Sequence, residues 1–262
     1  MKDAEFERET ALVTGAGSGI GKGAALRLAE AGAFVGLLGR TEEELEETLA
    51  EIRAGGGDGM VLVADVSKDD EMAQAVERLI RSRRGLHVVV ANAGINGTWA
   101  PIDDLRPDEF DKTIAVNLRG TYLTLHHTVG HMKKTGGSII VISSINGTRT
   151  FTTPGATAYS ATKAAQLAMV QQLALELGRH GIRINAICPG AIETDIDDNT
   201  KVRKKRQAEV PVEFPEGDIP LTGGESGTAE DVADVIAFLA SDASRHVTGT
   251  PIWVDGGQSL LR

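Results

Sequence analysis

The sequence predicts an α/β fold, a doubly wound sandwich in which helices cover both faces of a parallel sheet of about seven strands. Three observations carry this prediction. Short apolar runs alternate with longer helix-like segments along most of the 262 residues. The runs are continuously apolar, as in strands buried on both faces, and they lack the alternation of strands with one wet face. A glycine-rich turn follows the first run, at the kind of position where such folds bind ligands.

The elements follow from the spacing of apolar residues. Thr228 with Asp231, and Ser67 with Asp70, match the capping pattern that begins a helix. We expect a single domain over residues 1–262, with an irregular insertion at about 195–227 that would act as a substrate lid. The expected strands are 11–13, 34–38, 60–64, 87–91, 138–142, 183–188 and 252–254, and the expected helices are 20–31, 41–54, 68–82, 107–134, 157–179 and 228–241.

Composition limits the class of protein. The chain is 41% hydrophobic and 24% charged, and it has no apolar run long enough to cross a bilayer. Residues 1–9 lack the pattern of a signal peptide, and one cysteine excludes an intrachain disulfide, so we expect a cytoplasmic protein. That cysteine, Cys188, is expected to be a small core residue. A net charge of −10 argues against nucleic-acid binding.

The turn after the first strand reads TGAGSGIG over residues 14–21. Glycines permit a tight turn and let backbone N–H groups approach a pyrophosphate at the start of the next helix. The common G-x-G-x-x-G pattern is absent here, so the prediction depends on the strand–turn–helix context. The expected phosphate-binding residues are Gly15, Gly17, Ser18, Gly19, Ile20 and Gly21.

Tyr159 and Lys163 stand four residues apart within the expected helix 157–179. Residues at this spacing lie on the same face of a helix, so both side chains can reach one small volume. A free tyrosine titrates near pH ~10, and a nearby ammonium favours its ionised form. The spacing alone also fits an ordinary exposed helix, so both interpretations stand at this point.

Taken together, these motifs resemble the short-chain dehydrogenase/reductase family, in particular members similar to 3-oxoacyl-[acyl-carrier-protein] reductases. The resemblance runs from Thr10 to Gly257 and implies a Rossmann-type domain. It also implies an NAD(P)-dependent enzyme that transfers a hydride between nicotinamide and a carbonyl or secondary alcohol. The matching elements are Thr14, Gly15, Gly19 and Gly21 in the turn, Asn92-Ala93-Gly94 after the fourth strand, Asn117, Ser144, Tyr159 and Lys163, and Pro189-Gly190 followed by Thr194.

The resemblance implies a catalytic set of Asn117, Ser144, Tyr159 and Lys163. Tyr159 would exchange the proton, Lys163 would lower the tyrosine pKa and bind the cofactor ribose, and Ser144 would hold the substrate oxygen. Asn117 would hold a water that relays protons, and Ser143 competes with Ser144 for the serine role. The further cofactor contacts implied are Asp65, Val66, Asn92, Ala93, Gly94, Tyr159, Lys163, Pro189, Gly190, Ile192 and Thr194.

Two of these residues have alternative interpretations. Asp65 would accept from the adenine amino group by resemblance, but a carboxylate that caps the next helix fits as well. Asn92 fits a structural role, in which its amide ties neighbouring strands together.

The end of the second strand bears on the choice of cofactor. The acidic residue typical of NAD-binding folds is missing, and Gly39-Arg40 stands in its place. A guanidinium can pair with a 2′-phosphate, so the sequence favours NADP. Glu42 and Glu43 follow closely and oppose this, so NAD is the alternative. The alternative interpretation of Arg40 is that it only stacks on the adenine.

The substrate is expected to be a small carbonyl or alcohol in a pocket formed by loops 95–101, 145–154 and 191–221. Trp99 and Phe151 fit an apolar wall of this pocket, and core packing is the alternative for either. A ketone or 3-oxoacyl reductase is the first interpretation, and an alcohol or sugar dehydrogenase using NAD is the second. A non-catalytic regulator that senses nicotinamide is the alternative of another class.

Two charged features have several interpretations. The basic cluster, defined as Lys201, Arg203, Lys204, Lys205 and Arg206, fits a solvated helix face or a contact with an anionic substrate or acidic carrier protein. His127 and His131 have the spacing of metal ligands, but no third ligand accompanies them, so we expect no metal. The resemblance implies a homotetramer or homodimer formed through this helix and the one that bears Tyr159.

Overall fold

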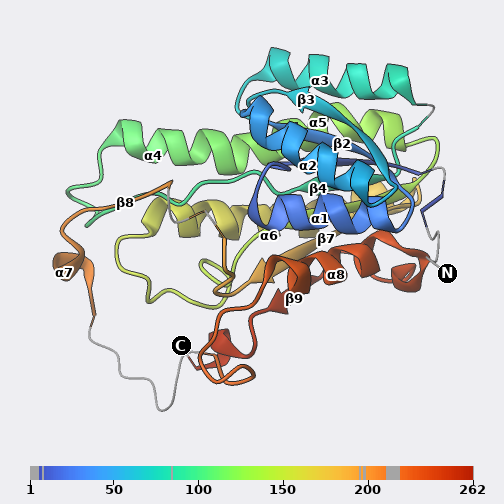
Figure 1. The fold of residues 1–262 in the computed structure, drawn as a ribbon. Coiled ribbons are helices and arrows are strands. Elements are labelled where there is room, and N and C mark those ends of the chain that lie inside the picture. Colours follow the sequence, from blue (N-terminus) through green and yellow to red (C-terminus); the bar gives the residue numbers. More distant parts are fainter. Residues whose placement is uncertain are drawn as a thin grey trace.

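Seven strands form one parallel sheet in the order β3-β2-β1-β4-β6-β7-β9 (Figure 1). The computed structural model describes residues 6–7, 9–83, 85–194, 196, 199–210 and 219–261. The predicted α/β fold class is confirmed, and the chain changes direction across the sheet between β1 and β4. The strands are β1 (Thr10–Thr14), β2 (Phe34–Gly39), β3 (Asp58–Val63), β4 (Val88–Ala91), β6 (Gly137–Ile142), β7 (Ile182–Pro189) and β9 (Pro251–Val254).

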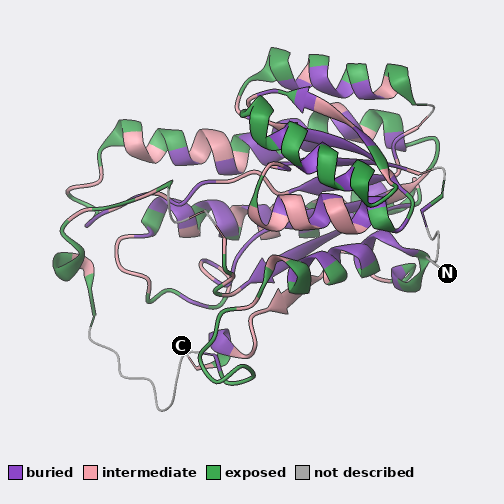
Figure 2. Ribbon diagram, viewed as in Figure 1, coloured by how far each residue is buried: buried purple, intermediate pink, exposed green. Residues whose placement is uncertain are grey.

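Helices cover both faces of the sheet because the central strands are apolar on both sides. Successive residues of β1 alternate between two cores, with Ala11 and Val13 in one and Leu12 in the other. Figure 2 shows these buried strands between helices whose outer surfaces are exposed. The first core lies under α1 (Gly19–Glu30), α2 (Glu42–Ala54) and α8 (Ala229–Ala240), and the second under α3 (Asp69–Ser82), α5 (Gly120–Met132) and α6 (Thr157–Gly178).

The expected helix 107–134 is three elements. α4 (Pro107–Thr113) leads into a π-helical turn, η1 (Ile114–Arg119), and then into α5. A π turn holds one residue more than an α turn, and such turns are frequent at functional sites. This one contains Asn117, whose side chain is fully buried.

One of the two predicted capping signals is wrong. α3 begins after Lys68, and the Ser67 hydroxyl donates instead to Asp65 Oδ1 (2.7 Å). The other is confirmed, because the Asp231 N–H donates to Thr228 Oγ1 (3.2 Å) at the start of α8. The Thr228 N–H donates in return to Asp231 Oδ2 (2.8 Å).

The segment expected to be irregular contains a short strand, β8 (Thr200–Val202), paired in parallel with β5 (Gly97–Trp99). A single turn, α7 (Lys205–Ala208), follows, and η3 (Asp242–Ser244) and η4 (Gln258–Leu260) come later in the chain. Residues 195, 197–198 and 211–218 of the predicted lid lie outside the described residues. Within the described part of the chain, no helix is long and apolar enough to span a membrane.

The basic cluster is not a uniform solvated helix face. The Arg203 guanidinium donates to both carboxylate oxygens of Glu109 (2.8 and 3.0 Å), and the backbone N–H of Arg203 donates to the Trp99 carbonyl (2.9 Å). Arg203 and Lys204 also pair with Asp104. The hydrogen bond from Arg203 lowers the pKa of Glu109 to about 2. Two of the five cations therefore fasten β8 to the segment after β5.

Candidate active site

A cleft of about 520 Å³ opens at the carboxyl ends of β1 to β4, where the sheet order reverses. Open α/β sheets bind their ligands at this switch point. Of the predicted cofactor contacts, the lining contains Gly15, Gly17, Ser18, Gly19, Ile20, Arg40, Asp65, Val66, Asn92, Ala93, Gly94 and Thr194. The lining does not contain Gly21, Tyr159, Lys163, Pro189, Gly190 or Ile192.

The glycine turn fits a pyrophosphate. Gly15 has φ +67°, which favours glycine, and a side chain at Gly21 would lie 2.0 Å from the Gly15 carbonyl oxygen. Ser18 precedes α1 but makes no side-chain capping bond to it. The first N–H groups of a helix have no partner within the helix and favour an anion. The turn therefore brings uncapped donors to the cleft lining.

Asn92 ties the first and fourth strands together, as its structural interpretation expects. Its Nδ2 donates to the carbonyls of Thr14 (2.9 Å) and Gly15 (3.3 Å). The Thr14 hydroxyl oxygen accepts from the N–H groups of Asn92 (3.0 Å) and Ala93 (3.1 Å). These bonds fix the glycine turn against the segment after β4.

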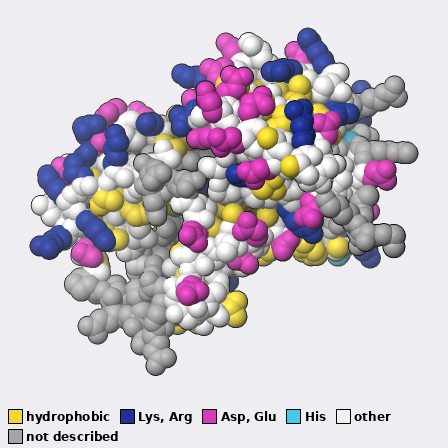
Figure 3. Space-filling model, viewed as in Figure 1, with side chains coloured by type: hydrophobic (Ala, Val, Ile, Leu, Met, Phe, Trp, Pro, Cys, Tyr) yellow, Lys and Arg dark blue, Asp and Glu magenta, His cyan; other side chains and the backbone are white. Residues whose placement is uncertain are grey.

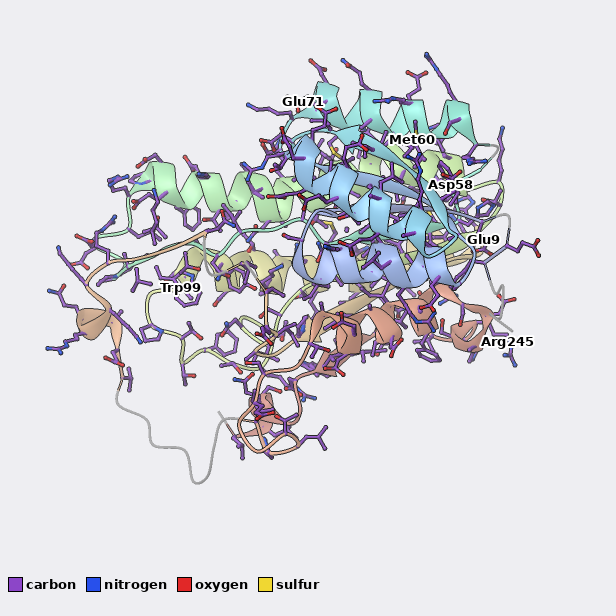
Figure 4. The ribbon with its side chains drawn as sticks, viewed as in Figure 1. Glu9, Asp58, Met60, Glu71, Trp99 and Arg245 are labelled. Atoms are coloured by element: carbon purple, nitrogen blue, oxygen red, sulfur yellow. The ribbon has the colours of Figure 1, made fainter. Side chains whose placement is uncertain are left out.

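Asp65 organises the turn after β3. Its Oδ1 accepts from the Ser67 N–H (2.8 Å), and its own N–H donates to Glu71 (2.7 Å), which Figure 4 labels at the start of α3. Burial raises the pKa of Asp65, but the bonds from Ser67 and the charges of Arg40 and Lys68 outweigh it and lower the pKa overall. An ionised carboxylate thus faces the cleft, and its contact with adenine stays a prediction.

Lys163 lies beside Tyr159 at the border of the cleft. Its Nζ donates to the Ile142 carbonyl (2.8 Å) and lies 5.5 Å from the centre of the Tyr159 ring. The same atom is 3.7 Å from the position of a Cβ on Gly94, a residue of the cleft lining. Lys163 is 3% exposed, and burial lowers its pKa to about 8. The pair predicted from the four-residue spacing is therefore brought together.

The two serines after β6 differ in their contacts. The Ser143 hydroxyl donates to the Lys163 carbonyl (2.8 Å), which commits it to α6. The Ser144 oxygen accepts from the Asn146 N–H (3.1 Å), so its own proton is not used in that bond. This geometry favours Ser144 for the substrate oxygen. Cys188 is fully buried as expected, and burial raises the pKa of its thiol.

Asn117 forms hydrogen bonds to the protein through both its side chain and its backbone carbonyl. Its side chain bonds both backbone groups of Ile95 (2.8 and 2.9 Å) and donates to Thr162 Oγ1 (3.2 Å). Its carbonyl accepts from Thr121 Oγ1 (2.7 Å) and Gln166 Nε2 (2.9 Å). Asn117 thereby fixes the segment after Gly94, and the predicted water relay stays a prediction.

Sequence reasoning missed Gln166 and part of the lining. A buried amide within the mostly apolar stretch 164–173 was the available signal for Gln166, which is 1% exposed. Among the lining residues it missed are Thr41 and Glu44, whereas Ile196 and Asn199 belong to the segment expected to form the substrate pocket. No local signal distinguishes Glu44 from its acidic neighbours.

Two of the three loops expected to form the substrate pocket, 95–101 and 191–221, meet where β5 pairs with β8. The Ala100 N–H also donates to the carbonyl of Gly155, which directly follows the third loop (3.2 Å). Phe151 is 74% exposed, which excludes core packing for it. Trp99, labelled in Figure 4, is half-buried and donates through Nε1 to the Asn96 carbonyl (3.2 Å).

The described residues contain no group of three or more His, Cys, Asp or Glu side chains that could hold a metal ion. His127 Nε2 instead bonds Asp69 Oδ1 (2.7 Å), which joins α5 to α3.

A cleft at the switch point, with Lys163 next to its lining and Tyr159 beside that lysine, fits a nucleotide-dependent oxidoreductase. Residues 15–259 match the family described as enoyl-(acyl carrier protein) reductase. The chain belongs to this branch of the short-chain dehydrogenase/reductase family and is an oxidoreductase of that family.

Three relatives illustrate the match. A 3-ketoacyl-ACP reductase from Sinorhizobium meliloti is 62% identical, with a TM-score of 0.94 over 97% of this chain and 100% of that one. A 3-ketoacyl-(acyl-carrier-protein) reductase from Brucella melitensis, complexed with NADH, is 32% identical, with a TM-score of 0.85 over 97% and 99%. Glucose 1-dehydrogenase from Gluconobacter oxydans is 36% identical over 262 residues, covering 97% of this chain and 93% of that protein.

Proposed function

We propose that this protein reduces a ketone or 3-oxoacyl substrate with a hydride from NADPH, so that NADP(H) is the preferred cofactor pair. The observation that carries this proposal is the buried ammonium of Lys163 beside Tyr159 at the border of the cleft. A pure binding protein has no need for a costly buried cation next to a phenol. The likeness to a 3-ketoacyl-ACP reductase supports this class of substrate.

When bound, the nicotinamide supplies the hydride. The Tyr159 hydroxyl donates its proton to the substrate oxygen, and Ser144 donates a hydrogen bond to the same oxygen. Lys163 has a pKa of about 8, so it is mostly protonated at neutral pH and stabilises the phenolate that forms. Asn117 positions the segment after Gly94 and contributes to the path that returns a proton to the site.

Arg40 is the proposed partner of the 2′-phosphate, because it lines the cleft at the end of β2. The remaining cofactor contacts are those predicted from the sequence, including Pro189, Gly190, Ile192 and Thr194 at the nicotinamide side. We also propose that the segment 195–227 forms the substrate lid, and that the enzyme is a cytoplasmic homotetramer or homodimer.

The second candidate is an alcohol or sugar dehydrogenase that uses NAD. The likeness to glucose 1-dehydrogenase favours it, and the same residues serve the reverse reaction, with the phenolate of Tyr159 accepting the alcohol proton. A nicotinamide-sensing regulator without turnover is disfavoured by the complete set of Ser144, Tyr159 and Lys163.

A substrate screen tests the proposal. Absorbance of the reduced nicotinamide is followed with NADPH and NADH against ketones and 3-oxoacyl thioesters, and with NADP and NAD against secondary alcohols and aldoses. The proposal expects the highest kcat/KM with NADPH and a ketone or 3-oxoacyl thioester. A higher kcat/KM for an aldose with NAD would favour the second candidate, and no turnover with any member would favour the regulator.

A further inference from the structure

We propose that Glu44 is a cofactor-discriminating residue, whose carboxylate selects against a 2′-phosphate and thereby opposes Arg40. The inference deepens the proposed function and rests on a nicotinamide dinucleotide binding in the cleft. From the sequence, the charge that distinguishes the two cofactors was expected at the end of β2. Glu44 lies further along the chain, on α2.

The carboxylate of Glu44 lies against the glycine turn. A Cβ added to Gly17 would lie 2.8 Å from the Cβ of Glu44 and 2.9 Å from its Oε2. Glu44 therefore takes the space beside the turn that a side chain at position 17 would fill. It lines the cleft together with Arg40 and Thr41.

The backbone that carries Glu44 is fixed against the same turn. The Thr48 hydroxyl donates to the Ala16 carbonyl (3.2 Å) and to the Glu44 carbonyl (3.0 Å). Leu45 is 1% exposed and belongs to the core beneath α2. The carboxylate can rotate, but its Cα keeps its distance from the glycine turn.

The charges of the lining disfavour a further anion. Within the described lining, one cation, Arg40, faces two carboxylates, Glu44 and Asp65. The outer face of α2 adds acidic side chains that Figure 3 shows gathered over this helix. They are Glu42, Glu43, Glu46 and Glu47, all exposed.

The two cofactors differ only by the group on the adenosine ribose. A phosphate monoester adds about 1.5 to 2 negative charges at pH 7. A 2′-hydroxyl adds none and can donate a hydrogen bond to a carboxylate. In this fold class the ribose is recognised near the end of β2 by an acidic residue for NAD or by an arginine for NADP. Glu44 supplies the acidic group and Arg40 the basic one, so the chain carries both determinants at once.

The test measures equilibrium binding in the full chain by titration calorimetry, with NAD, NADP, and the fragments 5′-AMP and 2′,5′-ADP as probes. Glu44→Gln removes the charge and keeps the shape of the side chain. Glu46→Gln is the matched control, because it removes the same charge from an exposed residue of α2 outside the lining. We expect Glu44→Gln to tighten NADP and 2′,5′-ADP by about three- to tenfold, the scale of screened contacts between one carboxylate and a phosphate. NAD and 5′-AMP should be unchanged or weakened.

The two possible failures are distinguishable. In the first case, wild type binds both dinucleotides, and the ratio of the NADP Kd to the NAD Kd is the same in wild type, Glu44→Gln and Glu46→Gln. This result overturns the role of Glu44 and leaves the proposed function standing. An equal shift in both variants also overturns it, because the effect would then be the net charge of α2. A wild-type chain that binds neither dinucleotide overturns the proposed function and this inference with it.

Discussion

Replacing Lys163 by methionine should make the protein more stable at neutral pH while removing its activity. The Lys163 ammonium is buried, and its pKa falls from 10.5 to about 8. The folded state therefore binds this proton less tightly than the unfolded state. At pH 7, which is below both pKa values, the buried ammonium lowers the free energy of unfolding by the full amount. At about 1.4 kcal/mol per pKa unit, this is roughly 3 kcal/mol.

The variant also loses the hydrogen bond to the Ile142 carbonyl, which costs about 1–2 kcal/mol. The net gain of Lys163→Met at pH 7 is then about 1–2 kcal/mol. As pH rises from 8 toward 10.5, folded Lys163 releases its proton first, so wild-type stability increases. By pH 10 the remaining cost is about 1 kcal/mol, and the advantage of the variant disappears.

Urea unfolding of wild type and Lys163→Met at pH 7 and pH 10 measures this directly. Other lysines and tyrosines titrate in both proteins and cancel in the difference. Lys205→Met, at an exposed position of α7, is the control and should show no pH-dependent difference from wild type. If the two proteins differ in their free energy of unfolding by the same amount at both pH values, the reasoning is refuted. That result would mean that folding does not lower the pKa of Lys163.

Three further predictions concern the cofactor contact at Arg40, the strand β8 and the buried amide of Gln166. Arg40→Asp should lower the NADP-to-NAD ratio of kcat/KM by tenfold or more, through lost attraction and added repulsion; an unchanged ratio removes Arg40 from the account. Arg203→Met removes the paired bonds to Glu109, so amide exchange of β8 should quicken about tenfold, and unaltered protection would show that strand pairing alone holds this segment. Gln166→Leu removes one of the two side-chain donors to the Asn117 carbonyl and should lower the free energy of unfolding by about 1–3 kcal/mol, measured in urea; a variant as stable as wild type contradicts this.

The sheet and most of its helices were predictable because their signals are local. A strand buried on both faces must be continuously apolar, as residues 138–142 are, and the helix that bears Tyr159 has no interruption before Gly178. The glycine turn was predictable from its place between a strand and a helix. The proximity of Tyr159 and Lys163 was predictable because residues four apart share a helix face.

The rest depends on contacts between distant residues. The π turn at Asn117 is held by Ile95 and Gln166, and β8 is three residues long with a partner about a hundred positions away, so neither has a periodic signal. Ser67 matched a capping pattern, but its hydroxyl is used by Asp65. Glu44 looks like any other acid of a charged helix, and only the packing of α2 against Gly17 distinguishes it.

The most direct measurement of the central claim is the rate of hydride transfer in a single turnover of Tyr159→Phe, set beside the affinity of the same variant for the dinucleotide. The phenol is held to be the proton donor, so the variant should bind dinucleotide within about twofold of wild type and lose at least a thousandfold in the rate. A Tyr159→Phe enzyme that turns over at the wild-type rate would contradict the account.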